Sequence, residues 1–170
     1  MSQLSLTSRS GRPGIPAGVQ AAASQVADWL NAHSITVLRV SLGLVFCLFG
    51  ALKFVPGLSP AEDLAIATID RLTFGIVSGG AALMLTAVTE TFIGLTMVTG
   101  RFLRSGLVVL GGALVGIMSP LVIFAGELFG NGPTLEAQYV IKDIVLAAAG
   151  LAVAGRVLSK SLDREGRAHV

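Results

Sequence analysis

Five ionisable side chains lie within or beside long apolar stretches of the chain: Arg39, Lys53, Glu90, Lys142 and Asp143. A charged side chain near the centre of a bilayer costs about 2.5–3.5 kcal/mol on insertion scales, so charges at this depth turn toward a partner or a polar cavity. A buried ion pair can simply fix the register of two helices. Charges that face a cavity can bind a polar group or relay protons. The sequence leaves both roles open.

Helical spacing indicates which way the charges of the first stretch point. Arg39, Gly43, Phe46, Gly50 and Lys53 fall on a single stripe of a helix. Glycines on such a stripe allow the backbone of a neighbouring helix to approach closely. We therefore expect this stripe to face other helices rather than lipid.

Depth in the membrane predicts two ion pairs. Glu90 and Asp143 each share a helix face with small residues, whereas Lys142 points about 100° away from Asp143 and can extend to the membrane surface. Arg39 and Glu90 are expected at a similar depth in the cytoplasmic half. Lys53 and Asp143 are expected near the outer boundary. We therefore predict buried charge pairs between Arg39 and Glu90 and between Lys53 and Asp143.

The elements that hold these residues are four long apolar runs. Hydrophobic residues make up 53% of the 170 residues and charged residues 13%, which is about half the charged share of a typical soluble domain. The mean hydropathy is +0.80. The runs cover about 35–55, 74–98, 103–124 and 139–158, and each reaches or approaches the roughly 20 residues that cross a bilayer as a helix. The sequence predicts an all-α, integral membrane four-helix bundle whose solvent is the lipid bilayer.

The distribution of Arg and Lys predicts the orientation. Residues 1–20 are interpreted as a disordered tail, 21–158 as the transmembrane domain and 159–170 as a charged tail. Cations occur in both tails and in the turn at 100–104, whereas the other two loops are poor in cations and carry acidic residues. Because cytoplasmic loops are enriched in Lys and Arg, both termini and the 100–104 turn are expected in the cytoplasm.

Short interfacial helices are expected outside the spans. Residues 21–34 have a weak helical pattern with Trp29 at interface height, although a polar lead-in to the first span is an equal alternative. Ser59-Pro60-Ala61-Glu62 has the form of a capping box. It predicts a helix from Pro60 to about Leu72, with Leu64, Ala65, Ile69 and Leu72 on one face toward the membrane.

Other motifs point to few kinds of chemistry. Cys47 is the single cysteine, so neither an intrachain disulfide nor a CxxC pair can form. The basic residues do not gather with aromatics, which argues against nucleic acid as a partner. No spacing of His, Cys or carboxylates predicts a metal site. Gly112 and Gly116 form a GxxxG pair, a weak signal for a homo-oligomer, and Pro120 is expected to kink the third span.

Three stretches together carry a recognisable combination of motifs: 39–60 with its Gly-x-x-Lys-Phe end, 87–104 with its glutamate, and 132–153 with Tyr-Val-Ile-Lys-Asp. The combination resembles the DoxX-like family of small bacterial inner-membrane proteins, including its reactive-chlorine-resistance-type relatives. The resemblance covers most of 35–158, and Ala137 stands where the family has glycine. The positions that match its motifs are Arg39, Gly50, Lys53, Phe54, Glu90, Pro133, Thr134, Glu136, Tyr139, Lys142 and Asp143.

The resemblance implies a link to thiosulfate:quinone oxidoreduction or to membrane complexes that resist oxidative stress. The first hypothesis is an accessory or scaffold subunit with an oxidoreductase partner, the second a quinone-linked redox subunit, and the third a small transporter or channel. A quinone needs an apolar slot with polar groups at its mouth. The outer side supplies such groups in Lys53, Glu136, Tyr139, Lys142 and Asp143. Because no cysteine pair, haem-ligand pair or flavin motif is visible, no catalytic residue is assigned.

Overall fold

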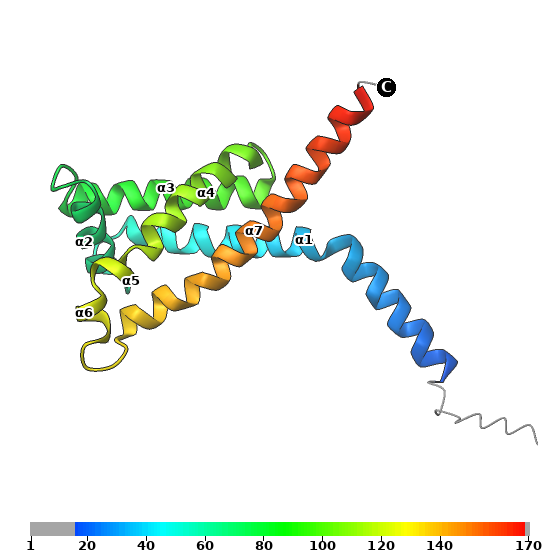
Figure 1. Cartoon of the computed structure of the whole chain (residues 1–170), viewed down its shortest axis with the longest axis horizontal. Coiled ribbons are helices and arrows are strands. Elements are labelled where there is room, and N and C mark those ends of the chain that lie inside the picture. Colours follow the sequence, from blue (N-terminus) through cyan, green and yellow to red (C-terminus); the bar gives the residue numbers. More distant parts are fainter. Residues whose placement is uncertain (1–15, 169–170) are drawn as a thin grey trace, which may run out of the picture. The chain divides into compact units, whose positions relative to one another are not determined.

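The computed structural model describes residues 16–168, and all regular structure in this range is helical (Figure 1). The long helices are α1 (Ala17–Lys53), α3 (Gly79–Thr99), α4 (Leu103–Met118) and α7 (Leu135–Ala168). Shorter helices connect them, namely α2 (Glu62–Leu72), α5 (Pro120–Ile123) and α6 (Ala125–Phe129). The predicted all-α class is therefore confirmed. The chain divides after Ser34 into two compact units.

The first unit contains the beginning of α1. The helix begins at Ala17, so the prediction of a disordered tail is wrong for residues 17–20, while residues 1–15 lie outside the described range. Trp29 stacks on His33 with ring centroids 5.1 Å apart, and Nδ1 of His33 lies 3.0 Å from the carbonyl oxygen of Trp29. Val26, Trp29 and Leu30 are exposed like the rest of 18–34, so the interfacial helix and the polar lead-in both stay predictions.

Three helical segments are long and apolar enough to cross a membrane: Gly18–Lys53, Gly79–Thr99 and Leu103–Ile123. They contain most of the first three predicted spans. The fourth predicted span, 139–158, lies inside α7, which is helical over this range but is not one of the three segments. Three charged residues, Lys142, Asp143 and Arg156, fall within that span.

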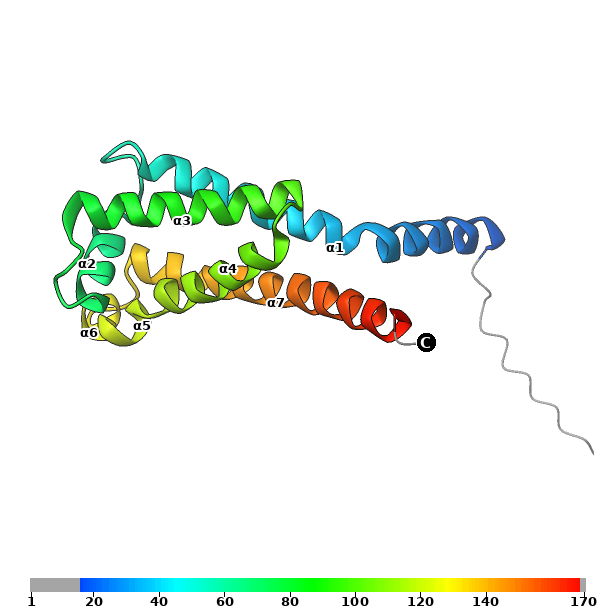
Figure 2. The ribbon, with the colours of Figure 1, turned by 90° about the horizontal axis from the view of Figure 1, so that it is seen from above.

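In the second unit, side chains from all four long helices form one apolar core. Its buried members are Leu42 and Phe46 from α1, Ile93 and Met97 from α3, Leu110 from α4 and Val153 from α7. Figure 2 shows α3 beside the second half of α1, and α4 beside α7. Close packing of these side chains gives the van der Waals contacts that hold the four helices to each other in lipid.

Glycine and proline set the ends of α3 and α4. Gly100 has a φ of +71°, and its N–H donates to the carbonyl of Thr96, so α3 ends in a left-handed cap. α4 stops at Met118, and a separate helix, α5, begins at Pro120. Proline lacks the N–H that would continue the helical ladder, and the regular helix is interrupted just before Pro120, where the sequence predicted a kink.

The start of α2 differs from its prediction. The helix begins at Glu62 rather than Pro60, and its N-cap residue, Ala61, forms no side-chain cap. The carboxylate of Glu62 instead accepts a hydrogen bond of 2.7 Å from the N–H of Gly57, and the Ser59 hydroxyl is buried without a partner in the described residues. The predicted capping box is therefore wrong, because the carboxylate is used by the preceding turn.

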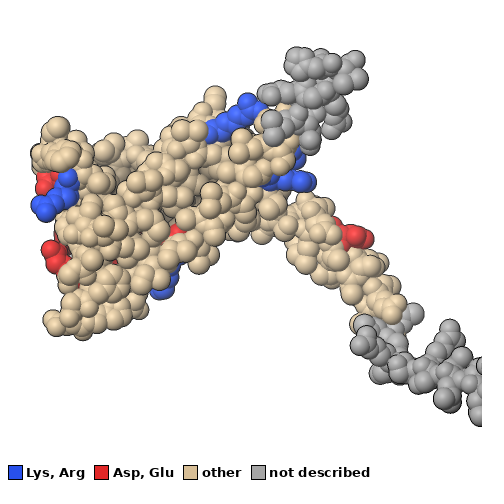
Figure 3. Space-filling model, viewed as in Figure 1, with Lys and Arg blue, Asp and Glu red and all other residues tan. Residues whose placement is uncertain are grey.

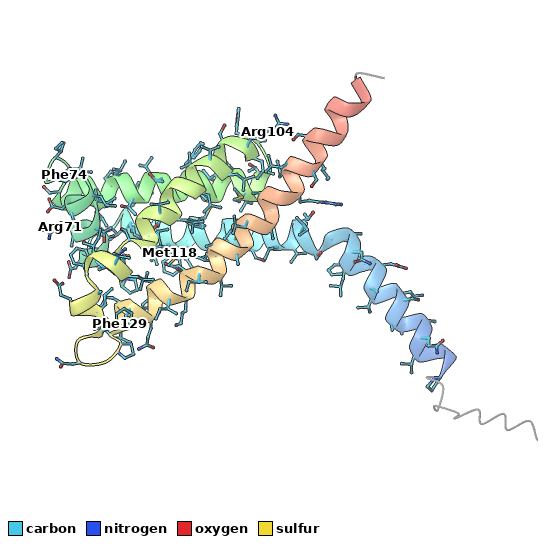
Figure 4. All side chains as sticks on the ribbon, in the orientation of Figure 1. Arg71, Phe74, Arg104, Met118 and Phe129 are labelled. Atoms are coloured by element: carbon cyan, nitrogen blue, oxygen red, sulfur yellow. The ribbon has the colours of Figure 1, made fainter. Side chains whose placement is uncertain are left out.

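Charged side chains lie mainly at the ends of the second unit. On the face drawn in Figure 3 they gather near the two ends of the α3–α4 pair, and uncharged atoms cover most of the band between them. Arg71 and Phe74 lie at one end of this pair and Arg104 at the other (Figure 4). At the C-terminus α7 continues to Ala168, so most of the predicted tail, 159–170, is helical.

Candidate functional site

An ion pair between α1 and α3 forms the centre of the charge cluster. Nζ of Lys53 donates hydrogen bonds of 3.0 and 2.8 Å to the two carboxylate oxygens of Glu90. The two side chains are only 6% and 9% exposed. Nζ also lies 5.8 Å from the centroid of the Phe49 ring, within the range of a cation–π interaction. A buried ion pair persists only when hydrogen bonds satisfy both ions, and this geometry supplies them.

The charge pairs predicted from depth are wrong. Glu90 pairs with Lys53 instead of Arg39, and within residues 16–168 Lys53 forms no salt bridge to Asp143. Arg39 and Lys53 are 14 positions apart on α1, which corresponds to about 21 Å along a helix. The same carboxylate therefore cannot serve both cations, and the packing register of α1 against α3 selects Lys53.

Arg39 binds the C-terminal end of α3. Its guanidinium donates to the carbonyl oxygen of Met97 and, at 3.4 Å, to that of Val98. Carbonyls in the last turn of a helix lack partners within the helix, and the helix dipole makes this end attractive to a cation. Arg39 is therefore a helix cap, a role that the sequence prediction missed.

Glycines fix the register of α1 against α3. A Cβ atom built on Gly94 would lie 2.5 Å from the backbone nitrogen of Cys47, and one built on Gly50 would lie 2.8 Å from that of Thr91. A Cβ built on Gly43 would lie 2.9 Å from the carbonyl oxygen of Gly94. Real Cβ atoms do not approach backbone so closely, so the helices touch here because the side chains are absent. The predicted inward direction of the α1 stripe is confirmed.

A cavity of about 440 Å³ lies beside the ion pair. Small-molecule sites in proteins have volumes of roughly 300–1,000 Å³, with mostly apolar walls and a few polar groups. Residues of α1, α2, α3, α4 and α7 line this cavity, and most of them are apolar. The residues with polar side-chain groups are Lys53, Thr68, Thr86, Thr89, Glu90, Tyr139 and Asp143.

The amphipathic face of α2 covers part of this cavity. Leu64, Ala65, Ile69 and Leu72 were expected to share one face, and all four line the cavity. Within the second unit this face is directed at the cavity, and its direction relative to the membrane stays a prediction. α2 packs against α3 and α4, so its apolar residues cover the gap between these helices.

The GxxxG pair of α4 also belongs to the cavity wall. Gly112 and Gly116 line the cavity, and a Cβ built on either would meet no atom within 4 Å. Within the chain, the two glycines therefore widen the cavity, and the weak signal for a homo-oligomer stays a prediction.

Part of the predicted polar mouth comes together at the cavity. Lys53, Tyr139 and Asp143 line it, whereas Glu136 and Lys142 are not among its lining residues. Lys142 is exposed, as its helical angle predicted, and its Nζ lies 5.2 Å from the centroid of the Tyr139 ring. Asp143 is half-buried and makes no hydrogen bond or ion pair with the described residues, although it interacts electrostatically with Glu90 and, less strongly, with Lys53.

The sequence prediction missed the threonines of the cavity wall. Thr68 donates its hydroxyl to the carbonyl of Leu64 at 2.6 Å, and Thr86 donates to that of Ala82 at 2.9 Å. A hydroxyl that donates one hydrogen bond can still accept others. The position of Thr86 on the same helix face as Glu90 was a usable signal, whereas Thr68 could be placed only once the direction of α2 was known.

No protein-family model matches the chain, and neither a curated protein nor a solved structure proved similar to it. Within the described residues, no three His, Cys, Asp or Glu side chains are grouped to hold a metal ion. The arrangement can bind a lipophilic molecule, with apolar walls for its body and the charge cluster for its polar head.

Proposed function

We propose that the chain is a multi-pass protein of the bacterial inner membrane, folded as a bundle of four transmembrane helices with both termini in the cytoplasm. The core shared by the four long helices supports α7 as the fourth span. Arg101, Arg104 and Arg156 mark the cytoplasmic side by the positive-inside rule. Asp63 and Glu127 then belong to the outer side.

We further propose that the cavity binds a quinone and that the protein is a quinone-linked subunit of a membrane oxidoreductase, of the DoxX-like type that the sequence resembles. The observation that carries this proposal is the cavity of about 440 Å³ with Lys53, Glu90 and Asp143 in its wall. A scaffold subunit requires only contact surfaces, so a scaffold role does not account for this cavity. A quinone has an apolar body and a polar ring, which match the two kinds of wall.

The test compares the quinone content of two glycine variants of α4. Gly116→Phe places a ring inside the cavity, since Gly116 lines it and open space surrounds its Cβ position. Gly111→Phe is the matched control, because Gly111 is exposed, has the same open space and does not line the cavity. The full chain is purified with its surrounding lipid, and quinone per protein is measured by mass spectrometry.

We expect wild type and Gly111→Phe to retain similar amounts of quinone and Gly116→Phe to lose most of it. Equal quinone content in Gly116→Phe and in the control would contradict quinone binding in this cavity. Quinone at or below the content of protein-free lipid particles in all three samples would contradict it as well.

A further inference from the structure

We propose that the cavity selects its ligand by the charge of the polar head: lipophilic molecules with a hydrogen-bond-donating or cationic head bind, and those with an anionic head are rejected. The inference rests on the proposed function and deepens it, because it names the head chemistry that the same cavity accepts. Of the two redox forms of a quinone, it favours the hydroquinone, whose hydroxyls are donors.

The charges in the cavity wall do not balance. Lys53 is matched by Glu90, which accepts two of its hydrogen bonds. Asp143 lines the same cavity and has no hydrogen bond or ion pair among the described residues. Neither α2 nor α4 contributes a charged residue to the lining. The lining therefore carries one more carboxylate than cation.

No other cation in the neighbourhood compensates for this carboxylate. Lys142 follows Tyr139 by less than one helical turn, but it is exposed, lies over the Tyr139 ring and does not line the cavity. Arg39 is engaged with the carbonyls at the end of α3. Asp143 is thus the carboxylate of the lining that no hydrogen bond or ion pair among the described residues satisfies.

An ionised carboxylate accepts hydrogen bonds and cannot donate them. Among apolar walls an unmatched carboxylate is costly, and a donor or cation supplied by a ligand would relieve that cost. An anionic head would instead add a second negative charge at short range, where repulsion is much stronger than in water. The head that fits beside Asp143 is therefore a hydroxyl, an amine or a similar donor.

The experiment uses three probes with the same tail: decylamine, decanol and decanoate. Their dissociation constants for the full-length protein are measured by calorimetry in one detergent at neutral pH. The proteins are wild type, Asp143→Asn and the control Asp63→Asn, which removes a carboxylate from an exposed position of α2. Each probe also partitions into the detergent, but this contribution to the apparent dissociation constant is the same for every variant and cancels when the variants are compared.

For wild type and Asp63→Asn we expect the amine and the alcohol to bind at least about tenfold more tightly than decanoate. In Asp143→Asn this preference should fall about tenfold or vanish. Equal binding of the three probes to wild type, or a preference that survives in Asp143→Asn, would overturn the inference and leave the proposed cavity intact. If no probe binds wild type, the lipophilic site itself is refuted. The wild-type comparison decides the matter even if Asp143→Asn fails to fold.

Discussion

Removal of one partner of the Lys53–Glu90 pair should destabilise the protein by about 3–5 kcal/mol. At an N–O distance of 2.8 Å and an effective dielectric constant of about 20, the attraction between the two charges is about 6 kcal/mol. The desolvation of both ions offsets much of this attraction in the native protein. In Lys53→Met, the carboxylate of Glu90 keeps its desolvation cost and loses the attraction, and Glu90→Gln strands the ammonium in the same way.

The double variant Lys53→Met/Glu90→Leu separates this explanation from simple loss of packing. Both ions are then absent, and apolar side chains of similar size fill the site. We expect the double variant to be within about 1 kcal/mol of wild type or more stable, because buried ion pairs are often replaced by apolar residues without loss. Lys142→Met is the control, since Lys142 is exposed, and it should change the stability by no more than about 0.5 kcal/mol.

The free energy of unfolding can be measured in mixed micelles of a mild detergent and sodium dodecyl sulfate, with loss of helical circular dichroism as the signal. Stabilities of Lys53→Met and Glu90→Gln that both lie within about 0.5 kcal/mol of wild type would refute the reasoning. A double variant whose loss equals the sum of the two single losses would refute it too, since partners in contact must couple.

Three further predictions concern packing, capping and orientation. Gly94→Ala should lower the free energy of unfolding by about 1–3 kcal/mol, because the added Cβ would overlap the backbone of Cys47. Gly111→Ala is the control: its Cβ would lie in open space, so the free energy of unfolding should stay the same or rise by up to about 1 kcal/mol. The micelle assay described above measures both variants. Arg39→Gln should cost about 1 kcal/mol and speed amide exchange in the last turn of α3, and unchanged exchange would contradict the capping role. A fluorescent reporter fused after Val170 should report a cytoplasmic location, whereas an active periplasmic reporter at that position would reverse the proposed orientation.

The helices of this fold could be predicted because length and composition constrain membrane segments strongly. A backbone that crosses lipid must satisfy its own hydrogen bonds, so an apolar run of about 20 residues is read as a helix. Residues 35–53, 79–98 and 103–123 confirm that rule. The start of α2 could not be predicted in this way. A carboxylate at this position can cap the helix or bind the preceding turn, and Glu62 binds the turn at Gly57.

The composition of the site could be predicted more readily than its pairing. Lys53, Glu90 and Asp143 were expected to turn inward, and all three line the cavity. Which charges meet depends on the register of α1 against α3, and the long connector that contains α2 permits several registers. The contact of Gly43 with Gly94 determines the register, and no single-sequence pattern states that these two glycines face each other.

The glycine contacts between α1 and α3 also determine which parts of the cavity can adapt. Where Gly43, Gly50 and Gly94 bring the two backbones together, neither helix can slide or rotate without overlap of atoms, so this wall is stiff. The wall made by α4 presents Gly112 and Gly116 to open space and has room to move. Shifts of α4 can therefore change the width of the cavity, while Lys53 and Glu90 on the stiff wall keep their positions.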